Sequence, residues 1–407
     1  MKSSIGLLII SLFSAAAVNA TAGELTLKPS LAVSEEFTDN VYQSHLDKQS
    51  DFITRVLPGL AGTYDAPLWQ WKLNYYYDYR YYARLKEHED THFLNGSGLI
   101  NIIDNLFYVA VNDAYQRVSL DVTRDTTTEG LLAESQSDSN TFSVSPYFLL
   151  LRDEENLVKV GYAYTNIWYK SPDAIDKYSH TGFIDVKHQI TSKLSFISDY
   201  VYVRQIGRDA ESDLHKALAG FNYEYAEKSN VYAQAGYGWY DSGTSQFSRP
   251  FWNAGLKHSL DRYEVNVATT TVYGEDPLQS TSLNNNYSVS VTGKWPKNTS
   301  TIGFRVGELI DTTTDTLSSR TYTGSFNTTQ QLTPDIDGSL SSFYDYIDIK
   351  YNNTYTTRFL ISPAVDYRLP YDINVRLLYQ YLTMYSPGIP EDNKDINRVI
   401  FEVRKTF

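Results

Sequence analysis

Charged side chains alternate with aromatic ones along residues 68–85, which read LWQWKLNYYYDYRYYARL. Asp78 and Arg80 stand two positions apart in this segment. Lys72 and Arg84 are also even-numbered, so each lies an even number of positions from them. Carboxylates and guanidinium groups gathered in this way can pair with one another, or bind polar solutes and ions through charge-assisted hydrogen bonds. The spacing therefore predicts the binding or guiding of polar solutes and requires no covalent chemistry.

The element that positions these charges is predicted to be a β-strand. Side chains alternate across a strand, so the odd-numbered residues from Trp69 to Leu85 form an apolar face and the even-numbered residues carry all the charges. Ordinary soluble strands are about 5–6 residues long, much shorter than this segment. Period and length together are typical of a transmembrane barrel strand, with rings toward the bilayer and ionic groups toward the lumen.

The mature chain is predicted to be exported. Lys2 precedes an apolar run at residues 5–18, and the small residues at 18–20 fit a cleavage site. We expect residues 1–20 to be a signal peptide, with cleavage after Ala22 as the alternative, and residues 21–407 to form one domain. No Cys is present, so neither a disulfide nor a lipid-modified cysteine is possible. Loss of Lys2 leaves 34 basic and 48 acidic side chains (34 − 48 = −14), which disfavours nucleic acid as a partner.

The order of segments along the chain predicts an all-β, antiparallel, up-and-down transmembrane barrel. The mean hydropathy is −0.38, and no stretch after the signal peptide reaches the length of an apolar membrane helix. A secreted β-sandwich or propeller is the alternative on composition alone. However, short turns alternate with longer polar loops throughout residues 25–407, as in outer-membrane barrels. We predict about 20 strands (18–22), both termini in the periplasm and a place in the bacterial outer membrane.

The alternation of odd- and even-numbered residues between the two faces of each predicted strand, here called parity, selects the side chains that should line the lumen. They are Lys72, Asp78, Arg80, Arg84, Arg204, Arg305, Arg358, Asp366, Arg368 and Arg376, with Tyr76 and Tyr82 as aromatic lumenal candidates. Five of the arginines, on strands near both ends of the chain, should become neighbours when the first and last strands pair; they are Arg80, Arg84, Arg358, Arg368 and Arg376. Parity also predicts that Asp78→Arg is better tolerated than Tyr77→Arg, because only Tyr77 would face lipid.

Three N-terminal segments carry a family resemblance: residues 27–44 (LKPSLAVSEEFTDNVYQS), 50–64 (SDFITRVLPGLAGTY) and 91–117 (THFLNGSGLINIIDNLFYVAVNDAYQR). They resemble the opening of the PEP-CTERM-system-associated outer-membrane protein family. The resemblance covers about the first 120 residues. It implies a Gram-negative outer-membrane barrel linked to exopolysaccharide production, and it supplies no catalytic residues.

Residues 88–92 (HEDTH) match the H-E-x-x-H zinc signature, which works only when a helix places both imidazoles on one face. We expect a short loop there, which leaves no room for such a helix. The nucleophile motif G-x-S-x-G is also missing. We therefore predict no catalytic residue, no metal site, no cofactor and no enzymatic activity, with an outer-membrane hydrolase as the least favoured alternative.

Two functions fit these features. The first is a porin-like channel that serves exopolysaccharide export or passes saccharides and small solutes. The alternative is a surface-exposed structural or adhesion barrel with a blocked lumen. Expected partners are outer-membrane lipids and lipopolysaccharide, the barrel-assembly machinery through the terminal Phe407, a polysaccharide, and periplasmic export proteins. The loop at residues 119–138 is expected to narrow the pore.

Overall fold

The computed structural model describes residues 23–407 apart from 121–135, 154, 209–210, 244, 275, 279–281, 313 and 351. Twenty antiparallel strands form one sheet, in which each strand pairs with its neighbours in sequence. The sheet closes because β1 (Glu24–Thr38) also pairs with β20 (Lys394–Thr406), from Ser30 opposite Thr406 to Thr38 opposite Arg398. The predicted closed barrel and its strand number are confirmed. Both candidate signal-peptide cleavage sites and most of the 119–138 loop lie outside the described residues.

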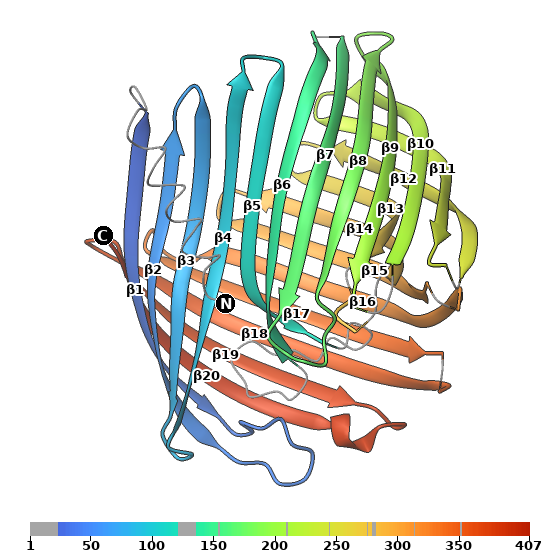
Figure 1. Cartoon of the computed structure of the whole chain (residues 1–407). Coiled ribbons are helices and arrows are strands. Elements are labelled where there is room, and N and C mark those ends of the chain that lie inside the picture. Colours follow the sequence, from blue (N-terminus) through green and yellow to red (C-terminus); the bar gives the residue numbers. More distant parts are fainter. Residues whose placement is uncertain are drawn as a thin grey trace.

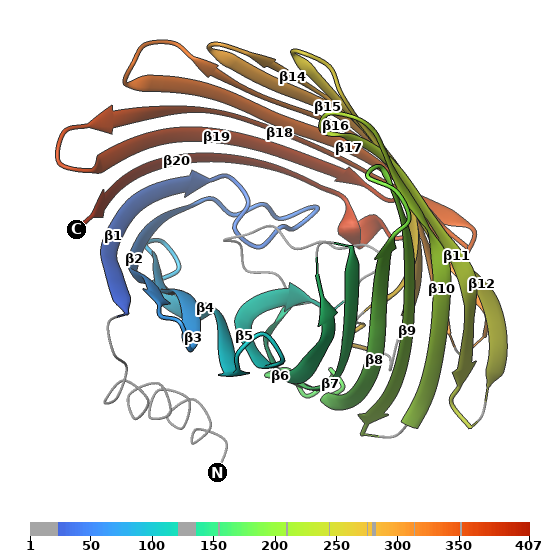
Figure 2. The ribbon, with the colours of Figure 1, turned by 90° about the horizontal axis from the view of Figure 1, so that it is seen from above.

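The remaining strands are β2 (Asp51–Asp65), β3 (Trp69–Tyr82), β4 (Glu87–Ile103), β5 (Phe107–Ser119), β6 (Gln136–Arg152), β7 (Asn156–Tyr169), β8 (Lys177–Gln189), β9 (Leu194–Gly207), β10 (Glu211–Ala226), β11 (Ser229–Asp241), β12 (Gln246–Ser259), β13 (Tyr263–Gly274), β14 (Ser282–Trp295), β15 (Asn298–Asp311), β16 (Thr316–Gln331), β17 (Ile336–Ile349), β18 (Thr354–Leu369) and β19 (Ile373–Tyr385); a 3-10 turn, η2 (Pro390–Asp392), precedes β20. Each strand has 12 to 17 residues, more than the 9–11 or so that cross a bilayer at a tilt. Figures 1 and 2 show the strands enclosing an interior, with β1 beside β20.

The two ends of the barrel differ. At the turn end, nine connections of two to four residues join the strands, in keeping with the short turns predicted between longer loops. The described residues begin and end there, since Glu24 pairs with Asp65 beside the first turn and the Phe407 N–H bonds the Pro29 carbonyl. The opposite, loop end carries the longer connections, among them residues 39–50, 170–176 and 386–393. The expectation that the turn end faces the periplasm remains a prediction.

The outer face is apolar, as the period-two pattern predicts. On β17 to β20 the exposed side chains alternate along each strand and are 37–52% exposed; they are Tyr344, Tyr346, Val365, Tyr367, Leu377, Tyr379, Val399, Phe401 and Val403. A closed sheet pairs its backbone groups within the wall, which is what a lipid environment requires. Among the described residues, no helix has the length and hydropathy to span a bilayer.

Two strands depart from expectation. β3 ends at Tyr82, three residues before the predicted limit, because the carboxylate of Asp51 binds the backbone N–H groups of Arg84 and Leu85. β17 departs from the period-two pattern, because its large side chains do not keep to one face, yet it pairs along its length with β16 and β18.

Candidate functional site

The inner face at the loop end is built around Asp78 on β3, which is only 2% exposed. Arg55 of β2 binds both carboxylate oxygens of Asp78, through Nε at 2.7 Å and Nη2 at 2.7 Å. Arg80 adds Nη2 at 2.5 Å from the same carboxylate. One buried acid therefore holds two guanidinium groups from neighbouring strands.

This ionic chain continues around the barrel to β6. The Tyr82 hydroxyl donates to Glu89 of β4 at 3.1 Å, and Glu89 also accepts from Arg117 of β5. Arg117 reaches Asp138 of β6 with Nε at 3.1 Å from Oδ1. Lys170 then approaches Asp138 from the 170–176 loop at 3.3 Å. Charges from five connected strands and a loop are thus linked by direct contacts.

A second buried pair lies across the seam between β1 and β20. Arg398 donates to Glu36 through Nε at 2.7 Å and Nη2 at 2.9 Å, and its Nη1 reaches Gln380 Oε1 of β19 at 2.9 Å. The side chains of Arg398 and Glu36 are only 5% and 4% exposed. The strands that close the barrel are therefore joined by a desolvated, bidentate ion pair.

A third group spans β16 to β18. Asp345 accepts a hydrogen bond from the Thr323 hydroxyl at 2.7 Å and from Arg358 Nη2 at 2.6 Å. The Arg358 guanidinium also lies 5.0 Å from the centre of the Phe343 ring. Asp345 is buried, so its charge is compensated by these donors.

Toward the turn end the inner face is wet. Lys72 and Asn74 are exposed, and the side chains of Arg376 and Arg404 are 46% and 52% exposed. Arg376 lies 3.8 Å from Asp366, too far for a close ion pair. Arg376 and Arg404 belong to a cavity of about 520 Å³, whose lining also includes Arg55, Tyr76 and Arg398. Basic side chains in this half of the lumen are accessible to solutes.

Loops fold inward and cover the loop end. Residues 39–50 turn into the interior, where Val41 is buried against Ile53 and Tyr82. Figure 2 shows this loop projecting across the opening. On another side of the mouth, Lys177 Nζ donates to the Asp276 carbonyl at 2.6 Å, which ties β8 to the loop after β13. Inward segments therefore cover part of the loop end, whereas the inner-face charges toward the turn end are exposed.

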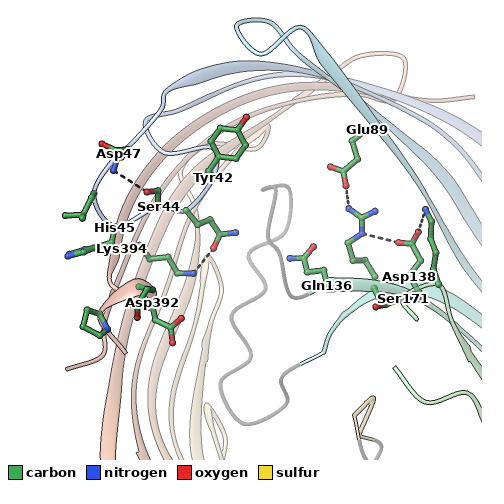
Figure 3. Close-up of a pocket in the computed structure, with 17 residues that line it drawn as sticks. Tyr42, Ser44, His45, Asp47, Glu89, Gln136, Asp138, Ser171, Asp392 and Lys394 are labelled. Atoms are coloured by element: carbon green, nitrogen blue, oxygen red, sulfur yellow. Dashed lines mark hydrogen bonds and ion pairs between the residues drawn. The ribbon is translucent and has the colours of Figure 1, made fainter. Parts of the chain in front are cut away.

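A cavity of about 1180 Å³ remains at this loop-end mouth. Figure 3 shows Tyr42, Ser44, Asp392 and Lys394 on one side of it, and Glu89 with other wall residues on the opposite side. We call this space the mouth cavity. Its lining combines the inward loop, the β4 to β6 wall, Lys170 and Ser171 of the loop after β7, and the segment from η2 to the start of β20.

Most residues predicted for the lumen do lie on the inner face. Ladder partners share a face, and by this criterion the inward set comprises Lys72, Tyr76, Asp78, Arg80, Tyr82, Arg305, Arg358, Asp366, Arg368 and Arg376. Closure of β1 on β20 brings β3, β18 and β19 into one wall, as expected. That these side chains line a conducting pore remains a prediction.

The lumenal position predicted for Arg204 is wrong. Its ladder partners are His180 and Asp213, and Tyr200, four residues away on the same face of β9, is exposed on the outside. Arg204 pairs there with Glu211 at 2.6 Å. A charge near the end of a barrel strand lies at headgroup depth, where an outward Arg costs little.

Arg84 and Tyr82 also differ from expectation. Arg84 lies in the connection after β3, where its guanidinium donates to the Ser50 carbonyl at 3.1 Å and stands 5.6 Å from the Phe52 ring centre. Tyr82 faces inward but is 1% exposed beneath Val41, so its ring offers no stacking surface. Tyr76 does line the cavity toward the turn end, although its ring stacks on Phe93 at 4.6 Å.

The HEDTH segment lies in β4 and not in the expected loop. His88 and His92 pair with Tyr81 and Tyr77 on the outer face, whereas Glu89 pairs with Arg80 on the inner face. The strand separates the groups that the zinc motif needs on one side. No group of three or more potential metal ligands occurs among the residues that the structure describes.

The sequence prediction missed Arg55 and Asp345, which pair with the predicted Asp78 and Arg358, and it missed the buried seam pair of Glu36 and Arg398. Arg398 had the correct parity on the last strand and could have been counted. Arg55 carries no such signal, because its strand, DFITRVLPGLAGTYD, has apolar residues on both faces. Its position follows only from the pairing of β2 with β1 and β3.

No protein-family model matches the chain, and neither does any curated protein. Solved structures do resemble it. The siderophore receptor PirA from Pseudomonas aeruginosa gives a TM-score of 0.54 at 8% identity, over 96% of this chain and 81% of that one. The ferric enterobactin receptor PfeA from the same organism gives 0.53 at 8%, over 95% and 82%. The FrpB iron transporter from Neisseria meningitidis gives 0.52 at 6%, over 93% and 81%.

At such low identity this likeness shows the fold alone. The chain has the architecture of Gram-negative outer-membrane barrels, and its closed wall and apolar outer face place it in the bacterial outer membrane. The resemblance to the PEP-CTERM-associated family stays a prediction.

Proposed function

We propose that this protein is an outer-membrane channel that passes saccharides or small polar solutes and serves exopolysaccharide export. The single observation that carries the proposal is the exposed inner face at the turn end, where Arg376 and Arg404 are half in solvent. So many ionic groups on an inner wall would cost several kcal/mol each if that wall were dry and they were unpaired. A water-filled lumen lined by guanidinium groups can bind and guide hydroxyl-rich or anionic solutes.

A blocked structural or adhesion barrel is the second candidate. The ion pairs around Asp78, Asp345 and Glu36 and the inward loop at residues 39–50 favour it, because they pack the loop end. In the channel proposal the same features form a constriction with the mouth cavity as its opening. Neither candidate requires catalysis. Lipopolysaccharide, the assembly machinery acting on Phe407 and periplasmic export proteins are proposed partners in both.

Conductance across planar bilayers separates the two candidates. We expect the purified barrel to conduct, and the double variant Arg376→Gln, Arg404→Gln to shift the reversal potential under a salt gradient toward cation preference. The shift follows because nearby charges in a narrow lumen outweigh loop charges beyond about 8–10 Å.

The control is Arg204→Gln, which removes an arginine from the outer face and should leave selectivity unchanged. A folded barrel without conductance would favour the blocked form. If the double variant and the wild type have the same ion selectivity, these arginines do not line the conducting path.

A further inference from the structure

The mouth cavity has the size of a ligand site. Its volume of about 1180 Å³ lies at the upper end of the range for small-molecule pockets, about 300–1,000 Å³. It is lined by several separate parts of the chain, and among the described residues none of its lining side chains belongs to the arginine-lined cavity toward the turn end. The cavity lies at the loop-end mouth of the barrel, so its chemistry bears on which solutes the mouth admits.

Gln43 supplies an unsatisfied donor in this lining. Its Oε1 accepts a hydrogen bond from Lys394 Nζ at 2.9 Å, and this contact sets the orientation of the amide, because an ammonium group cannot donate to an NH₂ group. Nε2 is then left buried without a partner among the described residues, on a side chain only 7% exposed. A buried donor without an acceptor is costly, so an oxygen from a bound molecule would be favoured there.

The backbone reinforces this arrangement. Gln43 has φ 55°, in the left-handed region that residues other than Gly seldom adopt. Its N–H bonds to the Asn40 carbonyl at 3.3 Å, and the buried Asn40 amide is held by the Ser44 backbone. The turn that presents Gln43 to the cavity is therefore built by specific bonds.

The charges of the lining select among oxygen-bearing solutes. Among the described residues of the lining, five carboxylates face three cationic side chains, a net of −2 with His45 neutral; these groups are Asp47, Glu89, Asp138, Glu391 and Asp392 against Arg117, Lys170 and Lys394. That balance disfavours an anion. The hydroxyl groups of a neutral sugar can donate to carboxylates and accept from Gln43 and the cations at the same time. Tyr42, 42% exposed, adds an apolar ring face for the C–H side of a sugar ring.

We infer that the mouth cavity binds a neutral, hydroxyl-rich saccharide unit, with Gln43 Nε2 donating to a sugar oxygen and Tyr42 packing against the ring. The inference rests on the proposed saccharide function and adds the class of sugar that the mouth selects. The arginines toward the turn end can bind anionic as well as hydroxyl-rich solutes, whereas the charge of the mouth cavity disfavours anions. The mouth cavity thus sets the specificity.

Calorimetric titration of the refolded barrel in detergent micelles tests this site without relying on conduction. Maltoheptaose is the neutral probe and hepta-galacturonate is the anionic one. We expect maltoheptaose to bind and hepta-galacturonate to bind at least roughly tenfold more weakly, because of like-charge repulsion worth about 1.4 kcal/mol. Gln43→Met should weaken maltoheptaose binding roughly 3–10-fold, the effect of one hydrogen bond.

Matched controls come from the same chain. Gln49→Met alters an exposed glutamine of the same loop that does not line the cavity, and it should leave affinity unchanged. Tyr42→Ala should weaken binding, whereas Tyr371→Ala, at an exposed turn-end tyrosine, should not. A heat-dependent gel shift checks that each variant folds.

Equal affinity for the two probes, no binding of maltoheptaose, or equal effects of Gln43→Met and Gln49→Met would overturn the inference. The outcomes also separate it from the proposed function. A barrel that conducts but does not bind maltoheptaose retains the channel and loses this site. A barrel that binds maltoheptaose through Gln43 but never conducts retains the site and loses the channel.

Discussion

Replacement of Asp78 by asparagine is expected to lower the free energy of unfolding by about 3–5 kcal/mol. The substitution keeps the size of the side chain but removes the negative charge shared by Arg55 and Arg80. Both guanidinium groups lie in a poorly solvated part of the inner face, and the next carboxylate, Glu89, is 4.0 Å from Arg80. Urea unfolding in lipid vesicles, followed by tryptophan fluorescence, measures the change.

Asp366→Asn is the matched control, since Asp366 is also an inward acid on a strand but is more exposed and lies 3.8 Å from Arg376. An exposed pair of this kind contributes about 0–1 kcal/mol. Equal stability of the Asp78→Asn barrel and the wild type would show that the buried network is not formed. The burial of Asp78 also replaces the expectation from parity that Asp78→Arg is well tolerated, because a third guanidinium would then face two others.

Removal of the seam arginine by Arg398→Met is expected to destabilise the closed barrel by about 3–5 kcal/mol as well, because Glu36 would remain buried and charged. The seam is shorter than the junction on the other side of β1. Nine residue pairs join β1 to β20, whereas fifteen join β1 to β2. The temperature at which the folded band disappears from an unboiled gel should fall.

The double variant Glu36→Met, Arg398→Met should recover much of the loss, because an apolar pair carries no uncompensated charge. Arg404→Met, on the same strand but half exposed, should change the transition little. If the double variant is no more stable than Arg398→Met alone, an uncompensated Glu36 charge is not what destabilises the seam.

The fold was predictable because it depends on local patterns. Period-two alternation in residues 68–85 gave the two faces of β3, and regular turn spacing gave the number of strands. Inward charges such as Arg358 and Arg376 followed from parity, since a charge in mid-strand cannot face lipid cheaply.

The predictions from odd–even alternation failed near strand ends and where a position depends on long-range contacts. On β9, Val201 and Val203 alternate with Tyr202 and Arg204, so both faces contain apolar residues and the assumption that a charge points inward failed. The Arg84 position depends on Asp51, a residue far away in sequence that ends β3. Which carboxylate pairs with which arginine requires the strand register, and the inward fold of residues 39–50 has no local signature.

The central claim is that the inner face is wet toward the turn end, and cysteine labelling on β3 tests it most directly. The chain contains no Cys, so single substitutions report only on their own positions. With a water-soluble, membrane-impermeant maleimide in proteoliposomes, Lys72→Cys and Asn74→Cys should be modified, whereas Leu73→Cys and Tyr75→Cys on the outer face should be protected by lipid. Protection of positions 72 and 74, or modification of 73 and 75 in their place, would contradict the account.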